Sequence, residues 1–310
     1  MGSGRLRDQY GERFNQGQPT WSGEKGGECL LGGVKQFGGH EVRELSTGGY
    51  ELSKGGVVVG SFRSGRIDPD RVVFPLSHGT WLEVSDRGTR EILSPEKAML
   101  GGLIASDGGN HFYYRFDKRL GYRVSYYTTR FASEDIELME LFDGLSEAVY
   151  DKTPRHYGKE GMRKGYISSK EVFYDLNDLG VKTGPDEFHI PREHLDSTGK
   201  RAYLAGFFSG DGNISKSTNG FEIRVYSEHK EGLEEVRQTF LDLGFHPSEI
   251  RESIRQRESR VEIIHNFSIP VKEHRRFAAE IGSHRPSHIG RLKKMGELWV
   301  CNEPLGGIWV

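Results

Sequence analysis

The 310-residue sequence predicts an α+β fold in which one αββαββα unit occurs twice, after a small β-rich module. The same order of helix and strand signals recurs about 104 residues further along the chain, which indicates an internal repeat. Apolar and polar residues alternate along the strand segments of both units, as in antiparallel sheets with one solvated face. Before the first unit, residues 1–94 hold 19 of the 42 glycines, which is typical of turns and short strands.

The N-terminal part of the chain is predicted to contain strands and no long helix. Residues 1–28 are polar and lack an apolar stretch, so we expect a mobile tail rather than a secretory signal. Residues 29–93 form the β-rich module, with apolar runs at 55–62, 71–76 and 80–84 that are separated by turn signals.

The first unit is expected over residues 94–195. Its first helix begins with Ser94 as N-cap, Pro95 at the first helical position and Glu96 in the first turn, and it ends before Gly108. The remaining elements follow as strands at about 110–118 and 121–129, a helix at 133–149, a strand at 165–169 and a helix at 170–179.

The second unit is expected over residues 196–310, in the same order. It consists of a helix at about 199–210, strands at 213–217 and 221–227, a helix at 229–243, strands at 249–257 and 260–269, a helix at 272–281 and a basic helical segment at 286–298.

Composition excludes several classes of protein. No run of 18 apolar residues is present and mean hydropathy is −0.62, so we expect no membrane span. The net charge of −2 does not indicate a strongly basic nucleic-acid binder, although residues 248–294 hold eleven Lys and Arg against six acids. The two cysteines, Cys29 and Cys301, exclude a disulfide scaffold and a zinc ribbon. We therefore expect an intracellular, cytoplasmic protein, with an organellar location as the open alternative.

Polar faces of the predicted strands are candidate nucleic-acid contacts. Arginine and tyrosine recur on one face of several strands, and the major groove of B-DNA admits a two-stranded β-ribbon in which arginine reads bases. A solvated sheet face is the alternative interpretation of any single strand. The candidate contacts are Arg115, Arg123, Ser125, Tyr127, Thr129, Lys216, Arg224, Tyr226, Arg251, Arg255, Arg257 and Arg260.

The first helices of the two units end alike, as LGGLIASDG over 100–108 and LAGFFSGDG over 204–212. Small residues stand four apart on one face of each helix, Gly102 with Ser106 and Gly206 with Gly210, so the two backbones could approach closely. Glycine inside a helix costs about 0.5–1 kcal/mol, which favours a packing reason for keeping it. We therefore predict a central interface between these two helices.

The aspartates that close these helices are candidate metal ligands. Asp107 and Asp211 each follow a helix C-terminus, where unpaired carbonyl groups already carry partial negative charge. Two such ends side by side would attract a hard divalent cation such as Mg²⁺, which prefers oxygen ligands and can activate water for phosphodiester hydrolysis. A lone Asp-Gly is more simply a turn, but here it occurs twice in the same context.

These two segments resemble the paired motifs of monomeric, two-repeat LAGLIDADG homing endonucleases, over residues 94–298. The second motif is close to the family pattern, whereas the first replaces an early Asp that is not a metal ligand. The resemblance implies saddle-shaped sheets along the major groove of a double-stranded DNA target. It also implies Mg²⁺, or Mn²⁺ in its place, on Asp107 and Asp211 with help from the carbonyls of Ser106 and Gly210. A basic residue near each acid is expected from Lys164, Lys170, Lys216, Arg260 and Lys272.

The sequence therefore predicts a site-specific endonuclease that cuts both strands of a long DNA target as a monomer, in intron homing. An intron maturase that binds host intron RNA, and a DNA-binding regulator that no longer cuts, stay open as alternatives. A degenerate intein remnant or an accessory DNA-contacting module are open interpretations of residues 29–93. His284 and His288 have the spacing of metal ligands, but without a third ligand we expect exposed histidines on a basic helix.

Overall fold

The computed structural model describes residues 34–46, 48–159, 161–181, 187–217, 220–256 and 261–296. The predicted tail at 1–28, both cysteines, Arg257 and Arg260 lie outside these ranges. Within them the chain forms two compact units, one of residues 34–36 and 40–63 and the other of residues 37–39 and 64–296.

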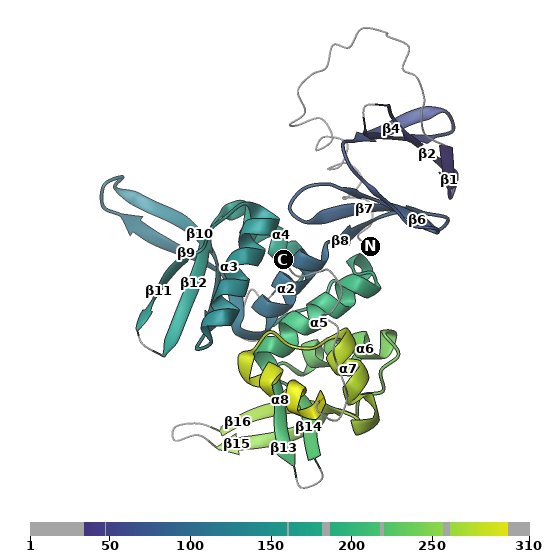
Figure 1. Ribbon diagram of the computed structural model, residues 1–310. Coiled ribbons are helices and arrows are strands. Elements are labelled where there is room, and N and C mark those ends of the chain that lie inside the picture. The colour runs from purple at the N-terminus through teal and green to yellow at the C-terminus, as the bar shows by residue number, and fades with distance from the viewer. Residues whose placement is uncertain are drawn as a thin grey trace. The chain divides into compact units, whose positions relative to one another are not determined.

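The smaller unit is a four-stranded antiparallel sheet. Its strands are β1 (Val34–Phe37), β2 (His40–Glu44), β3 (Tyr50–Lys54) and β4 (Val57–Phe62), which lie in the sheet in chain order (Figure 1). Val42 and Leu52 oppose each other across β2 and β3 and are both buried. This meander is the simplest way to pair short strands that are joined by glycine turns.

A second four-stranded meander opens the larger unit. It consists of β5 (Arg66–Ile67), β6 (Arg71–Pro75), β7 (Thr80–Ser85) and β8 (Gly88–Leu93), again in chain order. The sequence predicted one β-rich module over residues 29–93, whereas the structure divides it between the two compact units. The strand pattern did not reveal this division, because it does not show which strands share a sheet.

Two copies of an αββαββα arrangement follow this sheet. The first contains α2 (Pro95–Asp107), β9 (Gly108–Asp117), β10 (Tyr122–Ser133), α3 (Ile136–Tyr150), β11 (Arg155–Lys159), β12 (Met162–Ser168) and α4 (Lys170–Asp178). The second contains α5 (Ser197–Asp211), β13 (Gly212–Ser217), β14 (Gly220–Ser227), α6 (Lys230–Asp242), β15 (Arg251–Gln256), β16 (Val261–Ile269) and α7 (His274–Glu280). Short 3₁₀ turns, η1 (Arg192–His194) and η2 (Val271–Glu273), and a last helix, α8 (Pro286–Gly296), complete the described chain.

The two repeat sheets have the same topology. Their strand orders are β11-β12-β10-β9 and β13-β14-β16-β15, so corresponding strands occupy corresponding places and all pairs are antiparallel. The predicted internal repeat and α+β class are confirmed. Between α3 and α4 only the strand at 165–169 was predicted, and β11 is an additional strand. Gly158, with φ of +136°, interrupts the strand pattern of β11 in the sequence.

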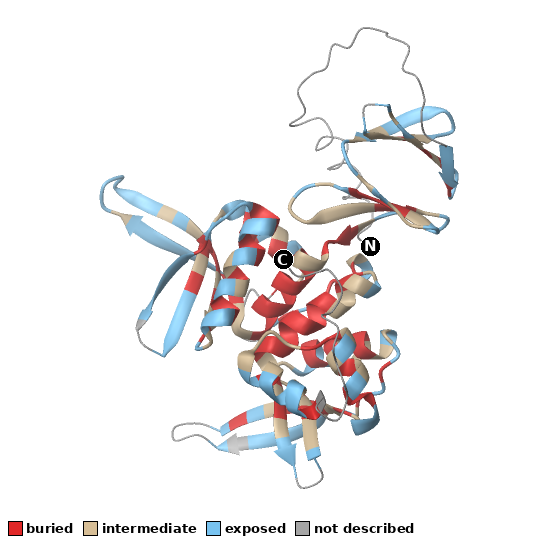
Figure 2. Cartoon of the chain, viewed as in Figure 1, coloured by how far each residue is buried: buried red, intermediate tan, exposed pale blue. Residues whose placement is uncertain are grey.

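Local signals explain where the central helices begin. The Ser94 hydroxyl accepts a hydrogen bond from the Lys97 amide at 3.2 Å and caps α2, and the Asp196 carboxylate accepts from the Gly199 amide at 2.7 Å and caps α5. Both helices are buried nearly all round, as Figure 2 shows by their red colour. They therefore form the centre of the hydrophobic core, which extends into both repeats. Among the described residues, no helix is both long and apolar enough to cross a membrane.

Candidate active site

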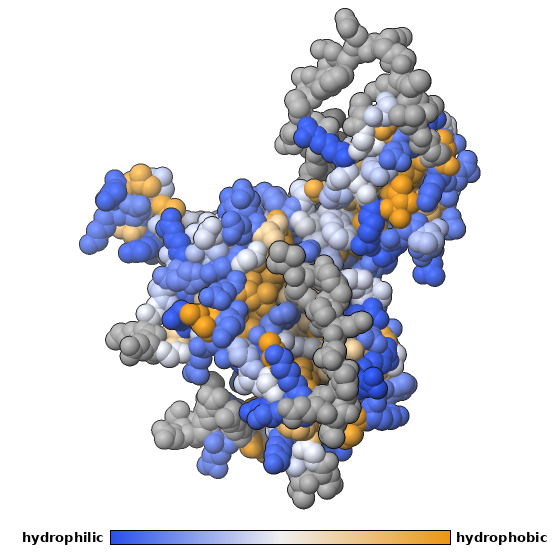
Figure 3. Space-filling model, viewed as in Figure 1, coloured by the Kyte–Doolittle hydropathy of each residue, from blue (hydrophilic) through white to orange (hydrophobic). Residues whose placement is uncertain are grey.

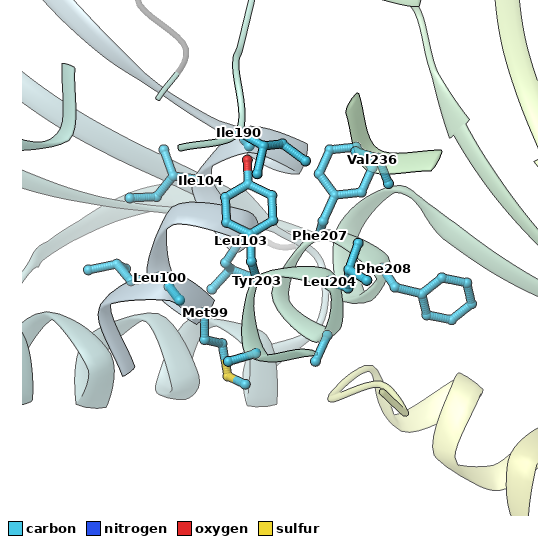
Figure 4. Packing of buried hydrophobic residues seen from close by; sticks show 14 of the residues in the cluster. Met99, Leu100, Leu103, Ile104, Ile190, Tyr203, Leu204, Phe207, Phe208 and Val236 are labelled. Atoms are coloured by element: carbon cyan, nitrogen blue, oxygen red, sulfur yellow. The ribbon is translucent and has the colours of Figure 1, made fainter. Parts of the chain in front are cut away.

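The central helices α2 and α5 touch backbone to backbone. A methyl group on Gly102 would overlap the Tyr203 carbonyl oxygen and lie 2.9 Å from the Phe207 nitrogen, and one on Gly206 would overlap the Met99 carbonyl. Figure 4 shows the side chains of Leu103 and Tyr203 between the two helices at this crossing. The small residues predicted for the helix interface thus lie at the contact itself, because only glycine leaves room for the opposite backbone.

The same contact brings the two aspartates together. Asp107 and Asp211 are the last residues of α2 and α5, and both are half-buried. A methyl group on Gly210 would overlap the Ser106 hydroxyl and lie 2.8 Å from Oδ2 of Asp107. The Asp107 carboxylate therefore lies against the last turn of α5, directly beside the residue that precedes Asp211.

Electrostatics make this position attractive to a cation. Each carboxylate adds to the partial negative charge of a helix C-terminus, and neither helix has a basic residue in its last turn. The donors are hard oxygens, the ligands that Mg²⁺ and similar ions prefer. No group of three or more His, Cys, Asp and Glu side chains that could hold a metal occurs among the described residues. The carboxylates fit a divalent ion whose other ligands are carbonyls, water and substrate oxygens.

Of the five basic residues proposed near the acids, the structure describes Lys164, Lys170, Lys216 and Lys272, which lie on four different elements. Lys164 is exposed on β12 and pairs with Ala132 of β10. Its neighbour Gly165 pairs with Phe131, which in turn pairs with Gly108 of β9, so Lys164 is the one nearest to the acids in the strand register. Two strand spacings of about 4.8 Å separate Lys164 from β9, which is about 10 Å. Lys164 is thus within reach of the site only through its extended side chain.

Lys170 and Lys216 lie further away. The Lys170 Nζ is 5.8 Å from the ring centres of Tyr127 and Tyr174, on the helix-covered face of the first sheet. Tyr127 is four residues along β10 from the partner of Gly108, and Lys216 is four residues along β13 from Gly212, which is about 13 Å in each case. The structure thus places Lys170 at the start of α4 and Lys216 along β13, each away from the helix ends that carry the acids.

Lys272 is exposed in η2, beyond the end of β16. Arg260 lies outside the described residues.

Cross-strand pairs show which face of the first sheet is open. Phe131, Thr129 and Asn110 are buried on one face, where the Thr129 hydroxyl donates to the Asn110 side chain at 2.6 Å. Tyr127 shares this face and packs against Phe173 and Tyr174 of α4. Thr129 is fully buried and cannot contact DNA, so its prediction is wrong.

The alternation along β10 was correct, but the face was misassigned. Arg123 and Ser125 lie an even number of residues from Thr129 along β10, so they belong to the same face of the sheet. They are exposed only because the β9–β10 hairpin extends beyond the helices (Figure 1). Arg115 lies on the opposite, open face, across from Val124. Tyr residues occur on both faces of this hairpin, so the sequence pattern did not show which face the helices cover.

The open face carries residues that the sequence analysis missed. Tyr113 and Tyr126 stack with ring centres 5.4 Å apart and planes within 9°, and the Arg130 guanidinium lies 5.9 Å from the Tyr113 ring centre. Arg130 is opposite Gly109, two residues after Asp107. These residues come together through the pairing register of β9 and β10, and the sequence alone does not give that register.

In the second sheet Arg224, Tyr226 and Arg251 lie on the open face. Arg224 and Tyr226 alternate along β14 with buried Ile223 and Val225, and Arg251 and Tyr226 both pair with Asn266. Lys216 lies on the opposite, helix-covered face, because it is two residues along β13 from buried Ile214.

Arg224 in the second sheet corresponds to Arg130 in the first. It is opposite Asn213, two residues after Asp211. The hydrogen bond that Arg224 donates to Glu222 is the main cause that raises the pKa of its guanidinium. Each repeat thus places one arginine beside the strand that leaves its acid.

Another arginine that the sequence analysis did not single out lies at the site itself. Arg285, in the segment before α8, donates from Nη1 to the Gly210 carbonyl at 3.2 Å and from Nε to Asp135 Oδ2 at 2.9 Å. Only its position in the basic C-terminal segment marked it in the sequence.

The histidines in this segment are not an exposed pair. The side chain of His288 is 2 % exposed, and burial is the main cause that lowers its pKa to about 4. Burial also lowers the pKa of His284. The expectation that both are exposed on a basic helix is therefore wrong, because this segment folds back onto α5: the His284 amide donates to the Ser209 hydroxyl at 2.8 Å.

Comparison with known proteins finds a family match for part of the chain. Residues 198–282, which lie in the second repeat, match the family model of the LAGLIDADG-like domain. This match covers α5, both hairpins of the second sheet and α7.

Curated relatives match over part of their length. A DNA polymerase of Thermococcus hydrothermalis is 28 % identical over 141 residues, which are 45 % of this chain and 8 % of the polymerase. The replication factor C small subunit of Methanocaldococcus jannaschii is 27 % identical over 177 residues, 56 % of this chain and 9 % of that protein. The chain thus spans less than a tenth of the length of these relatives.

Solved structures of homing endonucleases are similar at low identity. Mesophilic variants of I-DmoI have a TM-score of 0.44 and 20 % identity, over 61 % of this chain and 95 % of theirs. I-LtrWI bound to its target DNA has a TM-score of 0.42 and 13 % identity, over 66 % of this chain and 90 % of its own.

Proposed function

We propose that this chain is a site-specific DNA endonuclease of the LAGLIDADG type, which cuts both strands of a long target as a monomer and serves intron homing. The observation that carries the proposal is the convergence of two equivalent acids. Asp107 and Asp211 close the first helix of each repeat, and Asp107 Oδ2 lies against Gly210. The LAGLIDADG-like domain at 198–282 supports it independently.

The carboxylates would hold the divalent ion and fix its place between two scissile phosphates. Bound there, Mg²⁺ would lower the pKa of a water and stabilise the leaving oxygen during phosphodiester hydrolysis, and Mn²⁺ could take its place. The tight contact between α2 and α5 keeps the two carboxylates in a fixed relation. The glycines at this contact therefore support the chemistry as well as the fold.

The open faces of the two sheets would bind the target. Arg130, Arg224 and Arg251 supply positive charge there, and the stacked Tyr113 and Tyr126 supply planar contact area. Arginine is the commonest reader of guanine in the major groove, and two strands fit that groove. Two sheets placed by pseudo-symmetric repeats would follow a long, imperfectly palindromic site.

Cleavage of a randomised library of double-stranded DNA in Mg²⁺ tests this proposal. We expect the parent to give discrete products from one long site. Asp107→Asn and Asp211→Asn should each abolish double-strand cutting and keep DNA affinity within about tenfold, because a neutral amide keeps the shape of the carboxylate and loses its charge. Glu231→Gln, at an exposed carboxylate on α6, is the matched control and should cut like the parent. An acid variant that cuts at the parental rate would refute the metal assignment.

An exposed aromatic surface favours a second candidate function, that of an intron maturase. Phe112 and Tyr114 on β9 are 45 % and 63 % exposed on the helix-side face, where they form a continuous group of rings with Tyr127 and Tyr174. Figure 3 shows apolar patches on this hairpin. Unpaired RNA bases stack on such rings. Salt-sensitive binding to structured RNA with no cleavage of the library would favour this candidate, and the same binding to DNA alone would favour a regulator that no longer cuts.

A further inference from the structure

Arg285 breaks the pseudo-symmetry of the two helix ends. Its guanidinium donates to the Gly210 carbonyl at 3.2 Å, so a positive charge adjoins the last turn of α5. The equivalent carbonyl at the end of α2 is that of Ser106. In the described part of the chain, no side chain donates to the Ser106 carbonyl in this way.

The position of Arg285 is fixed from both sides. Its Nε donates to Asp135 Oδ2 at 2.9 Å, and Asp135 belongs to the first repeat whereas Arg285 belongs to the second. Asp135 stands at the N-cap of α3, yet its side chain makes no capping hydrogen bond. Aspartate at this position usually caps the helix that follows it, but Asp135 instead holds the Arg285 guanidinium across the boundary between the two repeats.

The segment that carries Arg285 is also anchored. The Ser209 hydroxyl accepts from the His284 amide at 2.8 Å, and the Ser283 hydroxyl accepts from the Arg285 amide at 3.2 Å and lies 3.0 Å from His288 Nδ1. Only about a quarter of the Arg285 side chain is exposed. This arginine is therefore part of the end of α5 and not a mobile surface charge.

Gly210 lies beside the Asp107 carboxylate, since a methyl group on Gly210 would come within 2.8 Å of Asp107 Oδ2. A divalent ion shared by Asp107 and the Gly210 carbonyl would meet an oxygen that already accepts a hydrogen bond from a cation. Both the engaged lone pair and the nearby positive charge weaken cation binding on that side. An ion that uses the Ser106 carbonyl would meet an oxygen to which no described side chain donates as Arg285 does to Gly210.

We propose that Arg285 is a positioning residue that makes the two halves of the candidate metal site unequal, so that the two DNA strands are cut at different rates. This inference rests on the proposed function. It assigns the slower cut to the half that contains the Gly210 carbonyl. Asp135 acts with Arg285, because it holds the guanidinium at the carbonyl.

The first test measures the rates of cutting of the two strands separately. A target duplex labelled differently on each strand, and a supercoiled plasmid carrying the same site, would be cut by the parent in Mg²⁺. We expect the parent to accumulate nicked circles, with a strand-rate ratio of at least about threefold. Arg285→Met should bring this ratio close to one by raising the slower rate. Arg285→Lys, which keeps the charge, should fall between them, and Asp135→Asn should change the ratio in the same direction.

Arg276→Met is the matched control for lost stability. Arg276 also donates to carbonyls at a helix end, those of Leu243 and Gly244 after α6, and also pairs with an acid, Glu280. It serves a different helix end from the one that carries Asp211. We expect this variant to lower the unfolding midpoint about as much as Arg285→Met while leaving the strand-rate ratio unchanged.

The second test needs no cleavage. Titration of Mn²⁺ alone into the full chain, followed by the electron paramagnetic resonance signal of the free ion, should show tighter binding at the weaker site in Arg285→Met, by about threefold or more. Arg276→Met should bind Mn²⁺ like the parent.

Four outcomes separate the hypotheses. Equal slowing of both strands, or unchanged Mn²⁺ binding, in Arg285→Met would overturn the role of Arg285 and leave the nuclease intact. A parent that binds Mn²⁺ but cuts no DNA would refute the proposed function instead. A parent that cuts both strands at equal rates would also overturn the inference.

Discussion

At the scale of single residues, the buried His288 gives the protein a predictable dependence on pH. Its ring packs against Phe208, with ring centres 5.3 Å apart, and Nδ1 lies 3.0 Å from the Ser283 hydroxyl. Burial, with the positive charges of Arg285 and Arg291 as smaller causes, lowers the pKa to about 4. In the unfolded chain the pKa returns to about 6.5.

The unfolded state therefore binds more protons than the folded state between about pH 4 and pH 6.5. Stability is full above the unfolded pKa and is lost as pH falls towards the folded pKa, by up to about 3 kcal/mol from this group. Urea unfolding at pH 7.5 and pH 5 should show this loss in the parent and a smaller loss in His288→Gln. An equal loss in both proteins would show that other groups control the acid response.

At the scale of elements, the contact between α2 and α5 depends on two glycines. Gly102→Ala would place a methyl group on the Tyr203 carbonyl, and Gly206→Ala on the Met99 carbonyl, so the helices must separate. We expect each variant to lose about 2–3 kcal/mol of unfolding free energy and to lose cleavage more steeply than DNA binding.

Gly144→Ala is the control for helix propensity. A methyl group there would meet nothing within 4 Å, and Gly144 is exposed within α3. This variant should gain about 0.5–1 kcal/mol, since alanine is the better helix former. Differential scanning calorimetry of the three variants would check both signs. A stable Gly102→Ala protein that cuts normally would contradict the close helix contact.

The elements also show what could be predicted from sequence. Asp107, Asp211 and the glycines could be predicted because each is part of a short motif that repeats, and because helix geometry places residues four apart on one face. The open face of β9 and β10 could not, since Thr129 and Arg130 alternate equally well in either orientation. Arg285 could not be predicted either, because its partners Gly210 and Asp135 lie 75 and 150 residues away in the chain.

At the scale of the whole molecule, the sheet β5–β8 supports the N-terminal ends of both central helices. Arg71 donates to Glu83 at 2.6 Å and pairs with Asp196, the N-cap of α5, at 2.9 Å. Lys97 of α2 is 1 % exposed and donates to the Thr80 hydroxyl at 3.0 Å, with Asp175 as its ion-pair partner at 2.7 Å. The sheet β1–β4 belongs to the other compact unit.

Two truncations should therefore behave differently. A chain that begins at Ser64 keeps the whole larger unit apart from residues 37–39, so its unfolding free energy should change by less than about 1 kcal/mol and it should still cut DNA. A chain that begins at Ser94 loses Arg71 and Thr80, which leaves buried Lys97 with fewer acceptors and Asp196 without its cation. Removing partners from buried charges costs about 3 kcal/mol or more, so this chain should unfold at much lower urea. Arg71→Met in the full chain should reproduce part of that loss. Equal stability of the two truncated chains would show that β5–β8 is an appendage and not a support of the central helices.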